Sequence, residues 1–162
     1  MKTVMGRKAL LVLTGVALLA FSSLVLSHCQ IPCGIYDDQA RFSMIAEEIR
    51  TIEKSMNEIV TLSAQDKPGY NQLVRWVQNK EQHADDLTHI VTFYFMAQRV
   101  TPFEKNDAEH YQGYVSQLTL LHQMIVYSTK AKQTVDLANV AKLRDLLAQF
   151  KNAYTQSQSH TH

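Results

Sequence analysis

The sequence predicts an all-α protein that folds as an antiparallel four-helix bundle. Apolar residues recur every three or four positions from Asp37 almost to the C-terminus, which is the period of an amphipathic helix. Few Gly and Pro interrupt this pattern, and an all-β chain would need many more turns. The pattern divides into four segments of roughly 20 to 30 residues, each with one apolar stripe that needs neighbours on one side only.

The residues ahead of the bundle begin with a typical secretory signal peptide. Three basic residues precede an uncharged apolar stretch, 9–26, and the small residue Ser27 follows it. We expect signal peptidase to cut after Ser27, so that the mature chain starts at His28 and has no membrane segment. The predicted location is the periplasm or the exterior. An uncleaved anchor stays open as an alternative, because 18 residues can just span a bilayer.

Removal of this leader changes the charge of the chain. The full sequence has 16 Lys and Arg and 15 Asp and Glu, and the leader takes Lys2, Arg7 and Lys8 with it. The mature chain is therefore slightly acidic, and we expect no nucleic-acid partner. Its two cysteines are too few for a dense disulfide framework.

The first helix of the bundle is predicted from Asp37 to about Gln65. Asp37 and Asp38 place carboxylates near its opening amides, and residues 66–69, Asp-Lys-Pro-Gly, form a turn after it. Its apolar stripe consists of Phe42, Ile45, Ile49, Ile52, Met56 and Ile59.

The other three helices follow the same reasoning. The second runs to Arg99, where Thr101 and Pro102 stop it, and the third runs from Tyr111 to about Lys132. The apolar stripe of the second helix is Leu73, Val77, Ala84, Leu87, Val91 and Phe95. That of the third helix is Tyr111, Tyr114, Leu118, Leu121 and Ile125, and that of the fourth is Val140, Leu143, Leu147, Phe150 and Tyr154. The predicted division of the chain is a cleaved leader, 1–27, a hook, 28–36, the bundle, 37–157, and a disordered tail, 158–162.

The nonapeptide at the predicted new N-terminus could hold a metal ion. Cleavage frees the α-amine of His28, whose pKa is normally near 8. The amide nitrogen and thiolate of Cys29 can close small chelate rings with the same metal, and the Cys33 thiolate can join them if the chain bends back. Pro32 and Gly34 favour such a bend. The His28 imidazole is a candidate fifth ligand.

The spacing alone leaves the metal and the bonding open. Tetragonal nitrogen-rich coordination suits Ni(II) or Cu(II), whereas a tetrahedral set of two nitrogens and two sulfurs suits zinc. A deprotonated amide beside an amine favours a planar array, and so nickel or copper. A local disulfide between Cys29 and Cys33 is the structural alternative.

The motif His-Cys-x-x-Pro-Cys-Gly-x-Tyr ahead of a four-helix bundle resembles the nickel hook of the nickel superoxide dismutase family. Every set position is filled, by His28, Cys29, Pro32, Cys33, Gly34 and Tyr36. The stretch at 103–105, Phe-Glu-Lys, also resembles the family. The resemblance implies disproportionation of two superoxide anions to dioxygen and hydrogen peroxide, with nickel alternating between Ni(II) and Ni(III). The alternative is an exported nickel- or copper-binding bundle without enzymatic activity.

The resemblance also implies roles for individual residues. The metal ligands would be the amine and imidazole of His28, the amide nitrogen and thiolate of Cys29, and the thiolate of Cys33. Tyr36 matches the tyrosine that lines the approach to nickel, although a packing role for it stays open. The family assembles as a homohexamer, which we expect here.

The chain departs from the family around the imidazole. Where the family's first helix has a Glu that orients the imidazole, this chain has Ser43, and at the position of an Arg on the second helix it has His83. A metal-bound histidine usually needs an orienting partner on its other nitrogen. We expect that partner to be Ser43, Glu47 or His83. His122 is expected to be an ordinary bundle residue.

Overall fold

The computed structural model describes residues 36–159 of the 162-residue chain. Most of the predicted hook, the whole leader and the last three residues lie outside this range. The described residues contain no strand, which confirms the all-α prediction. Among the helices of these residues, no candidate membrane span is found. The elements are α2 (Asp38–Ser63), α3 (Tyr70–His89), the π-helix η1 (Ile90–Arg99), α4 (Ala108–Gln133) and α5 (Leu137–Ser159).

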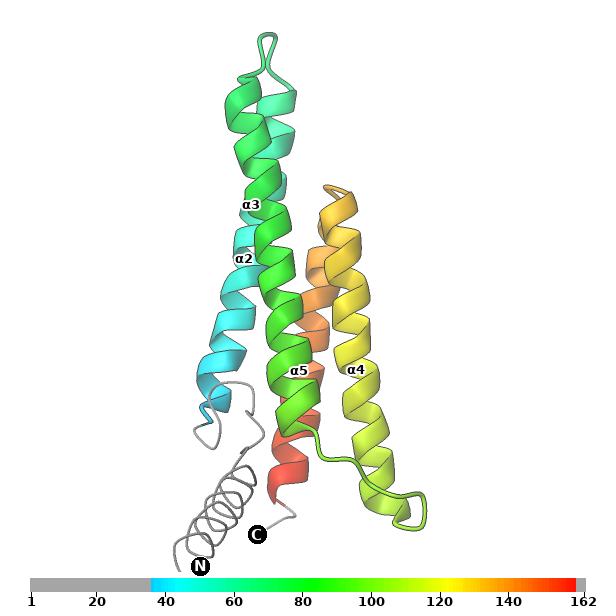
Figure 1. Cartoon of the computed structure of the whole chain (residues 1–162). Coiled ribbons are helices and arrows are strands. Elements are labelled where there is room, and N and C mark those ends of the chain that lie inside the picture. Colours follow the sequence, from blue (N-terminus) through cyan, green and yellow to red (C-terminus); the bar gives the residue numbers. More distant parts are fainter. Residues whose placement is uncertain (1–35, 160–162) are drawn as a thin grey trace, which may run out of the picture. The chain divides into compact units, whose positions relative to one another are not determined.

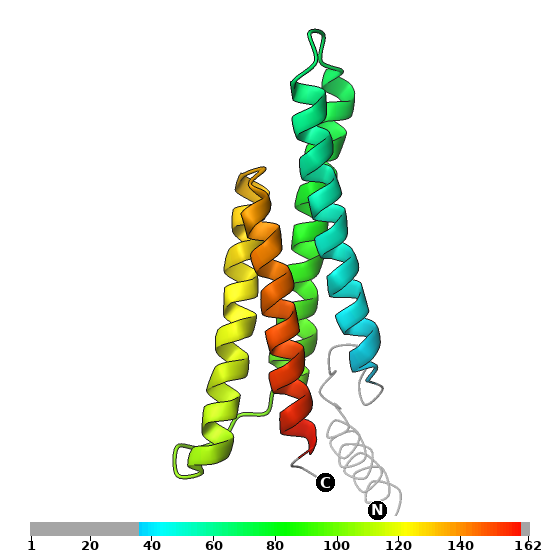
Figure 2. The same cartoon turned by 180° about the vertical axis from the view of Figure 1, so that it is seen from behind.

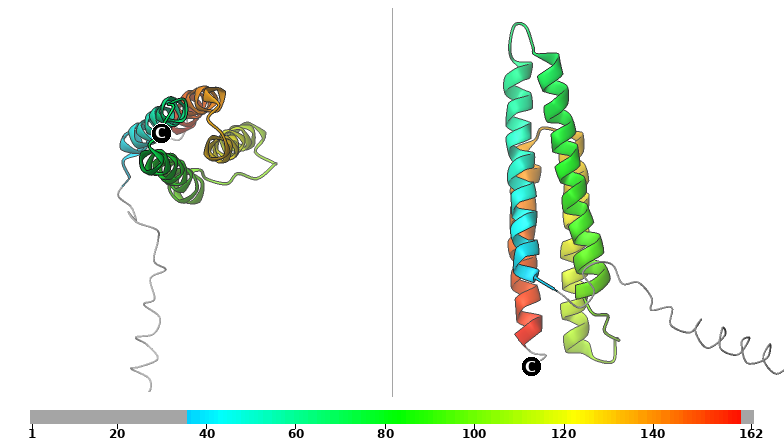
Figure 3. Two further views of the ribbon diagram at one scale, coloured as in Figure 1. Left: turned by 90° about the horizontal axis from the view of Figure 1, so that it is seen from above. Right: turned by 60° about the vertical axis from the view of Figure 1, so that its left-hand side comes forward.

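These elements pack as four antiparallel rods, as predicted (Figure 1). α2 packs against α3 and α4 against α5, and the two hairpins join through contacts of α3 with α4 and of α2 with α5 (Figure 3). The turn of the α2–α3 hairpin extends beyond that of the α4–α5 hairpin (Figure 2). Near that turn, where two helices cover only each other, Val60 and Val74 are 51% and 54% exposed.

The two aspartates at the start of α2 have different hydrogen-bond partners. Asp37 caps the helix, because its Oδ1 accepts a hydrogen bond from the Ala40 amide at 2.8 Å. Asp38 lies in the first turn of α2, as predicted, and its carboxylate accepts hydrogen bonds from η1 and α5. The buried face of α2 contains the predicted residues, with Ile59 half-buried at its end, and also Ser55, which was not predicted.

The predicted second helix reaches Arg99, but its last ten residues, η1, have π-helical hydrogen bonding. The Val100 amide continues this pattern by donating to the Phe95 carbonyl, five residues back, at 2.9 Å. In an α-helix, residues four apart are neighbours on one face; in a π-helix, residues five apart take that place. Tyr94 and Arg99 therefore share a face of η1. Phe95 is buried, as predicted, and Tyr94 is buried beside it.

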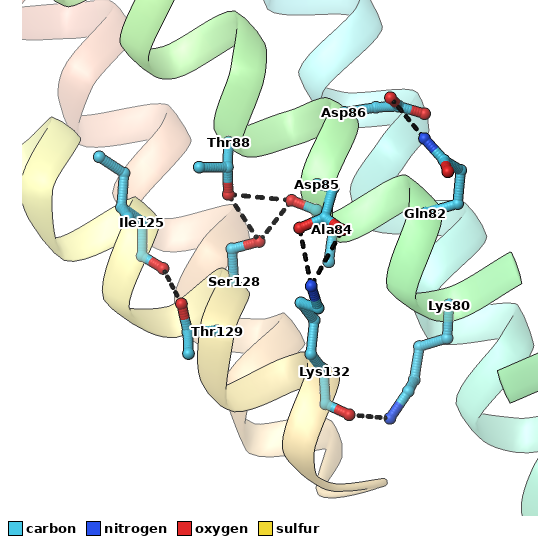
Figure 4. Close-up of polar contacts among 10 residues, drawn as sticks. All are labelled: Lys80, Gln82, Ala84, Asp85, Asp86, Thr88, Ile125, Ser128, Thr129 and Lys132. Carbon is cyan, nitrogen blue, oxygen red and sulfur yellow. Dashed lines mark hydrogen bonds and ion pairs between the residues drawn. The ribbon is translucent and has the colours of Figure 1, made fainter. Parts of the chain in front are cut away.

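The buried stripe of α4 is rotated relative to the expected one. Met124 and Ser128 are fully buried, while the predicted Leu118 and Ile125 are only partly so. The Ser128 hydroxyl donates to the Ala84 carbonyl of α3 at 2.7 Å (Figure 4). A small hydroxyl allows close contact between the two helices and finds a partner there. An apolar-stripe analysis overlooks such a position because the residue is polar.

A lysine of α3 caps the C-terminal end of α4. Lys80 is only 4% exposed, and its Nζ donates to the carbonyls of Lys132 at 2.6 Å and Thr134 at 2.9 Å; the first bond is drawn in Figure 4. α4 ends at Gln133, so these carbonyls have no helical donor. Burial lowers the pKa of Lys80, and the negative end of the helix dipole favours its charged form.

Candidate functional site

The described chain begins at Tyr36, the last residue of the predicted hook. The Arg99 guanidinium carbon lies 4.4 Å from the centre of the Tyr36 ring. The Tyr94 ring meets the Tyr36 ring edge to face, with centroids 6.0 Å apart. Tyr36 is still 40% exposed. The point where the hook joins the bundle is therefore held by η1, while a large part of the phenol remains accessible.

Arg99 is in turn fixed by Asp38. Its Nε donates to Asp38 Oδ1 at 2.8 Å and its Nη2 to Oδ2 at 2.7 Å, which is the two-pronged geometry of a strong arginine–carboxylate pair. The Tyr94 hydroxyl donates to Oδ1 at 2.7 Å and the Tyr154 hydroxyl to Oδ2 at 2.8 Å. One carboxylate thus joins α2, η1 and α5. We call Asp38, Tyr94, Arg99 and Tyr154 the Asp38 network.

The charges of the Asp38 network follow from its hydrogen bonds. Burial alone would raise the pKa of Asp38, but the hydrogen bonds from Arg99, Tyr94 and Tyr154 outweigh it and hold that pKa below its usual value. Burial and the neighbouring carboxylate raise the pKa of Tyr94 to about 12 and also raise that of Tyr154. At neutral pH the network therefore contains one ion pair and two protonated phenols.

Aromatic rings of the core pack against the Asp38 network. Phe95 lies 4.9 Å from Phe42 and 4.9 Å from Phe150, measured between ring centroids, and the Phe42 ring lies 5.9 Å from that of Tyr154. These side chains come from α2, η1 and α5 and are nearly or fully buried. Because these rings are closely packed, the side chains of the Asp38 network have little room to move.

A second arginine flanks the same site. The Arg41 guanidinium carbon lies 5.0 Å from the centre of the Tyr94 ring, and its Nη1 lies 3.2 Å from the sulfur of Met44. Among the described residues Arg41 has no ion-pair partner within 4.0 Å. The Arg99 guanidinium therefore lies over the Tyr36 ring and that of Arg41 over the Tyr94 ring, and only Arg99 is paired with a carboxylate.

A further polar cluster joins α2 and α3. His83 Nδ1 is hydrogen-bonded to Glu48, and Asp86 lies one turn along α3 from His83. One ligand atom from each of the three residues falls within 4.8 Å of the other two. Gln82 also donates to Asp86 at 3.0 Å. The contact with Glu48 holds His83 in one orientation, and Asp86 has its own partner in Gln82.

The three residues expected to orient the imidazole have different surroundings. Ser43 is exposed, and its hydroxyl donates to the Gln39 carbonyl of its own helix at 3.0 Å. Glu47 is exposed on α2, whereas His83 is half-buried against Glu48. Sequence reasoning missed Glu48. Its position three residues after Ile45 and four before Ile52, beside the buried stripe, is the signal that could have found it.

The predicted ligands His28, Cys29 and Cys33 lie outside the described residues, so the ligand set stays a prediction. His122 is exposed on α4 and belongs to no possible metal-binding group in the part of the chain that the structure describes.

Comparison with known proteins identifies the chain. The family model for nickel-containing superoxide dismutase matches residues 23–158, a range that includes the predicted hook and almost all of the bundle. The chain belongs to the nickel-containing superoxide dismutase family. A relative, superoxide dismutase [Ni] of Streptomyces seoulensis, is 27% identical over 134 residues, which cover 82% of this chain and 89% of that protein. No solved structure matches significantly.

Membership in the nickel-containing superoxide dismutase family confirms three predictions. The chain is an oxidoreductase, its activity is that of a superoxide dismutase with superoxide as substrate, and its cofactor is nickel. The alternative of a metal-binding bundle without enzymatic activity is not favoured.

Proposed function

We propose that the chain disproportionates superoxide at a nickel ion bound by His28, Cys29 and Cys33. The observation that supports this most is that every set position of the hook motif is filled in residues 28–36, which lie within the range that the family model matches. The donors also fit the metal chemically. Anionic thiolate and amide donors place charge on nickel, and nitrogen-rich tetragonal sites suit Ni(II).

In the proposed reaction, two superoxide anions and two protons give dioxygen and hydrogen peroxide. Nickel, when bound, supplies the one-electron steps by alternating between Ni(II) and Ni(III). The Tyr36 phenol orders water beside the metal and restricts entry to small anions. The Arg41 guanidinium, which lies 5.0 Å from the centre of the Tyr94 ring and has no ion-pair partner among the described residues, adds positive charge to this end of the bundle, where an anionic substrate would approach.

The direct test is superoxide decay by the mature protein loaded with nickel. We expect Cys29→Ser and Cys33→Ser each to lower activity at least about a hundredfold, because loss of one thiolate removes both a ligand and its charge. Ser63→Ala, at the far end of α2, is the control and should keep full activity. Full nickel occupancy without turnover in the unsubstituted protein would instead support a metal carrier.

We further propose that signal peptidase removes residues 1–27 and that the protein functions in the periplasm or outside the cell. Export fits the composition of the leader, and the cut creates the amine ligand at His28. N-terminal sequencing of the native protein tests both points. A start at any residue other than His28 would remove that ligand and contradict the proposed coordination.

The partner that orients the His28 imidazole is proposed to be one of Ser43, Glu47 and His83. The bond between His83 and Glu48 favours His83, because it fixes the ring of a residue that stands at the position of the family's arginine. Electron paramagnetic resonance of the oxidised, nickel-loaded protein would report on the nitrogen that the His28 imidazole would supply as a ligand. His83→Gln should alter that spectrum, and Ser43→Ala and Glu47→Gln should leave it unchanged. The opposite pattern would assign the role to Ser43 or Glu47.

We propose a homohexamer as the assembly, by resemblance to the family. A short N-terminal hook gains stability when neighbouring subunits cover it, because binding to the folded form shifts the equilibrium toward order. Sedimentation of the mature protein should give six times the mass of one chain. A stable monomer with full activity would contradict this proposal.

A further inference from the structure

We infer that Arg99 is a positioning residue for Tyr36, and that Asp38 holds Arg99 in place for this purpose. The inference rests on the proposed role of Tyr36 beside the nickel site. Arg99 contacts the ring of Tyr36 and is not itself a proposed ligand. It therefore acts on the reaction through the orientation of the phenol.

The contacts of Arg99 define the plane of its guanidinium group. Two of its nitrogens bond to the two oxygens of Asp38, so the group lies in a fixed fork. This arrangement leaves the faces of the guanidinium free to stack on aromatic rings. The Tyr36 ring lies 4.4 Å from the guanidinium carbon and the Tyr154 ring 6.0 Å from it. Stacking of this kind is attractive and directional.

The π-helical bonding of η1 is what places both Tyr94 and Arg99 on Asp38. In an α-helix, residues five apart point roughly 140° away from each other. In η1 they lie one turn apart on the same face, so Tyr94 and Arg99 both reach Asp38 Oδ1. Tyr94 also touches the edge of the Tyr36 ring. The unusual helix therefore serves the contacts that hold Tyr36.

Asp38 is free for this role because Asp37 caps α2. The Asp38–Arg99 pair is also the least exposed Arg or Lys ion pair among residues 36–159, with side chains 25% and 21% exposed. Lys142 and Asp145, a typical surface pair, are 36% and 51% exposed. A shielded pair with two additional phenol donors has little freedom to rearrange. Because the Arg99 guanidinium is held in this pair and stacks on the Tyr36 ring, it fixes the orientation of that ring.

Fluorine NMR of the nickel-loaded protein labelled with 3-fluorotyrosine tests the inference. The chain has seven tyrosines, and comparison with Tyr36→Phe assigns the Tyr36 signal. In Arg99→Lys the charge remains but the planar fork is lost. We expect the Tyr36 signal to move toward that of Tyr70, which is 70% exposed and serves as an internal reference for a solvated ring.

Arg144→Lys is the matched control for this spectrum. Arg144 also pairs with a carboxylate on α2, that of Glu53, but this pair does not involve Tyr36. The Tyr36 signal should be unchanged in this variant. Asp38→Asn gives a second route if Arg99→Lys folds poorly, because it keeps Arg99 and removes the charge that orients it. An unmoved Tyr36 signal in folded Arg99→Lys or folded Asp38→Asn would overturn the inference.

Activity in a double-mutant cycle separates positioning from a general loss of structure. Arg99→Lys should lower superoxide decay roughly tenfold in the wild-type background, as expected for a misplaced group near a reaction. The same substitution should cost little in the Tyr36→Phe background, where the phenol is absent. Equal losses in both backgrounds would contradict the inference. If the nickel-loaded wild-type protein were inactive, the proposed function would fail, and the fluorine spectra would still decide whether Arg99 positions Tyr36.

Discussion

At the scale of single residues, Asp38 has the greatest influence on the described part of the site. Its two oxygens accept four hydrogen bonds, from Tyr94, Tyr154 and two nitrogens of Arg99. A charged acceptor makes stronger hydrogen bonds than a neutral one, and removing it leaves several donors without a partner. Stability and geometry near the hook therefore both depend on this carboxylate.

The pH dependence of the free energy of unfolding should show the contribution of the Asp38 carboxylate. Because the hydrogen bonds hold the pKa of Asp38 below its usual value, its contribution to the free energy of unfolding is complete above about pH 4. That contribution is lost as the pH falls through the folded-state pKa. Asp38→Asn should lower the free energy of unfolding by about 2 kcal/mol at pH 7 and flatten its decline toward pH 3. Urea unfolding at several pH values measures both effects.

Asp145→Asn is the control for this titration. Asp145 is paired with Lys142 on the surface of α5, where solvent screens the interaction. Its loss should leave the stability at pH 7 almost unchanged. If Asp38→Asn behaved like Asp145→Asn, the Asp38 network would not contribute to stability as described.

At the scale of elements, the junction between α3 and α4 shows how a helix end is satisfied by a neighbour. Lys80 of α3 donates to the carbonyls of Lys132 and Thr134 at the end of α4. Ser128 of α4 donates to the Ala84 carbonyl of α3 (Figure 4). Helix ends leave backbone groups without internal partners, and buried ones need side-chain donors. These bonds fix the position of α3, which continues into η1, relative to α4.

Replacement of Lys80 by Met should destabilise the protein. Met fills a similar volume but cannot donate, so the carbonyls of Lys132 and Thr134 lose their partner. We expect a loss of about 1–3 kcal/mol in the free energy of unfolding, measured with urea at pH 7.

Lys142→Met provides the comparison for Lys80→Met, since Lys142 pairs with Asp145 on the exposed face of α5. We expect no measurable change in its unfolding curve. Equal stability of the two variants would show that the cap on α4 contributes nothing.

At the scale of the whole molecule, the core of the described residues is formed by side chains of the bundle helices. The described core extends from Phe42 to Tyr154 and includes side chains from every helix. Burial of this apolar surface is the main source of folding free energy. Metal binding and folding should therefore be separable in this protein.

Adding one Gly before His28 of the mature chain tests this separation. The extension converts the α-amine into an amide and so removes one proposed nickel ligand while leaving the bundle sequence intact. We expect nickel content and superoxide decay to be lost and the thermal unfolding midpoint of the metal-free protein to stay the same. A large drop in that midpoint would show that the N-terminus contributes to the core.

The helices and the proposed ligand set could be predicted from the sequence because both depend on residues near one another in the chain. Apolar spacing predicted four amphipathic segments, and the hook motif is contained in nine consecutive residues. The rotated face of α4 was missed because Ser128 is polar and because Met124 stands directly before Ile125, so apolar spacing alone did not separate the two. The bond between His83 and Glu48 was not predicted, because it joins two helices whose relative rotation the sequence does not state.

What the sequence determined by itself is local: where helices begin and end, which side of most of them is buried, and which donors stand at the proposed N-terminus. The tertiary structure decided which distant residues meet. Asp38 contacts Tyr94, Arg99 and Tyr154, which are 56, 61 and 116 residues away along the chain. Helical periodicity gives the direction of a side chain relative to its own helix axis, whereas contacts depend on the packing between helices and on the π-helical turn that aligns Tyr94 with Arg99.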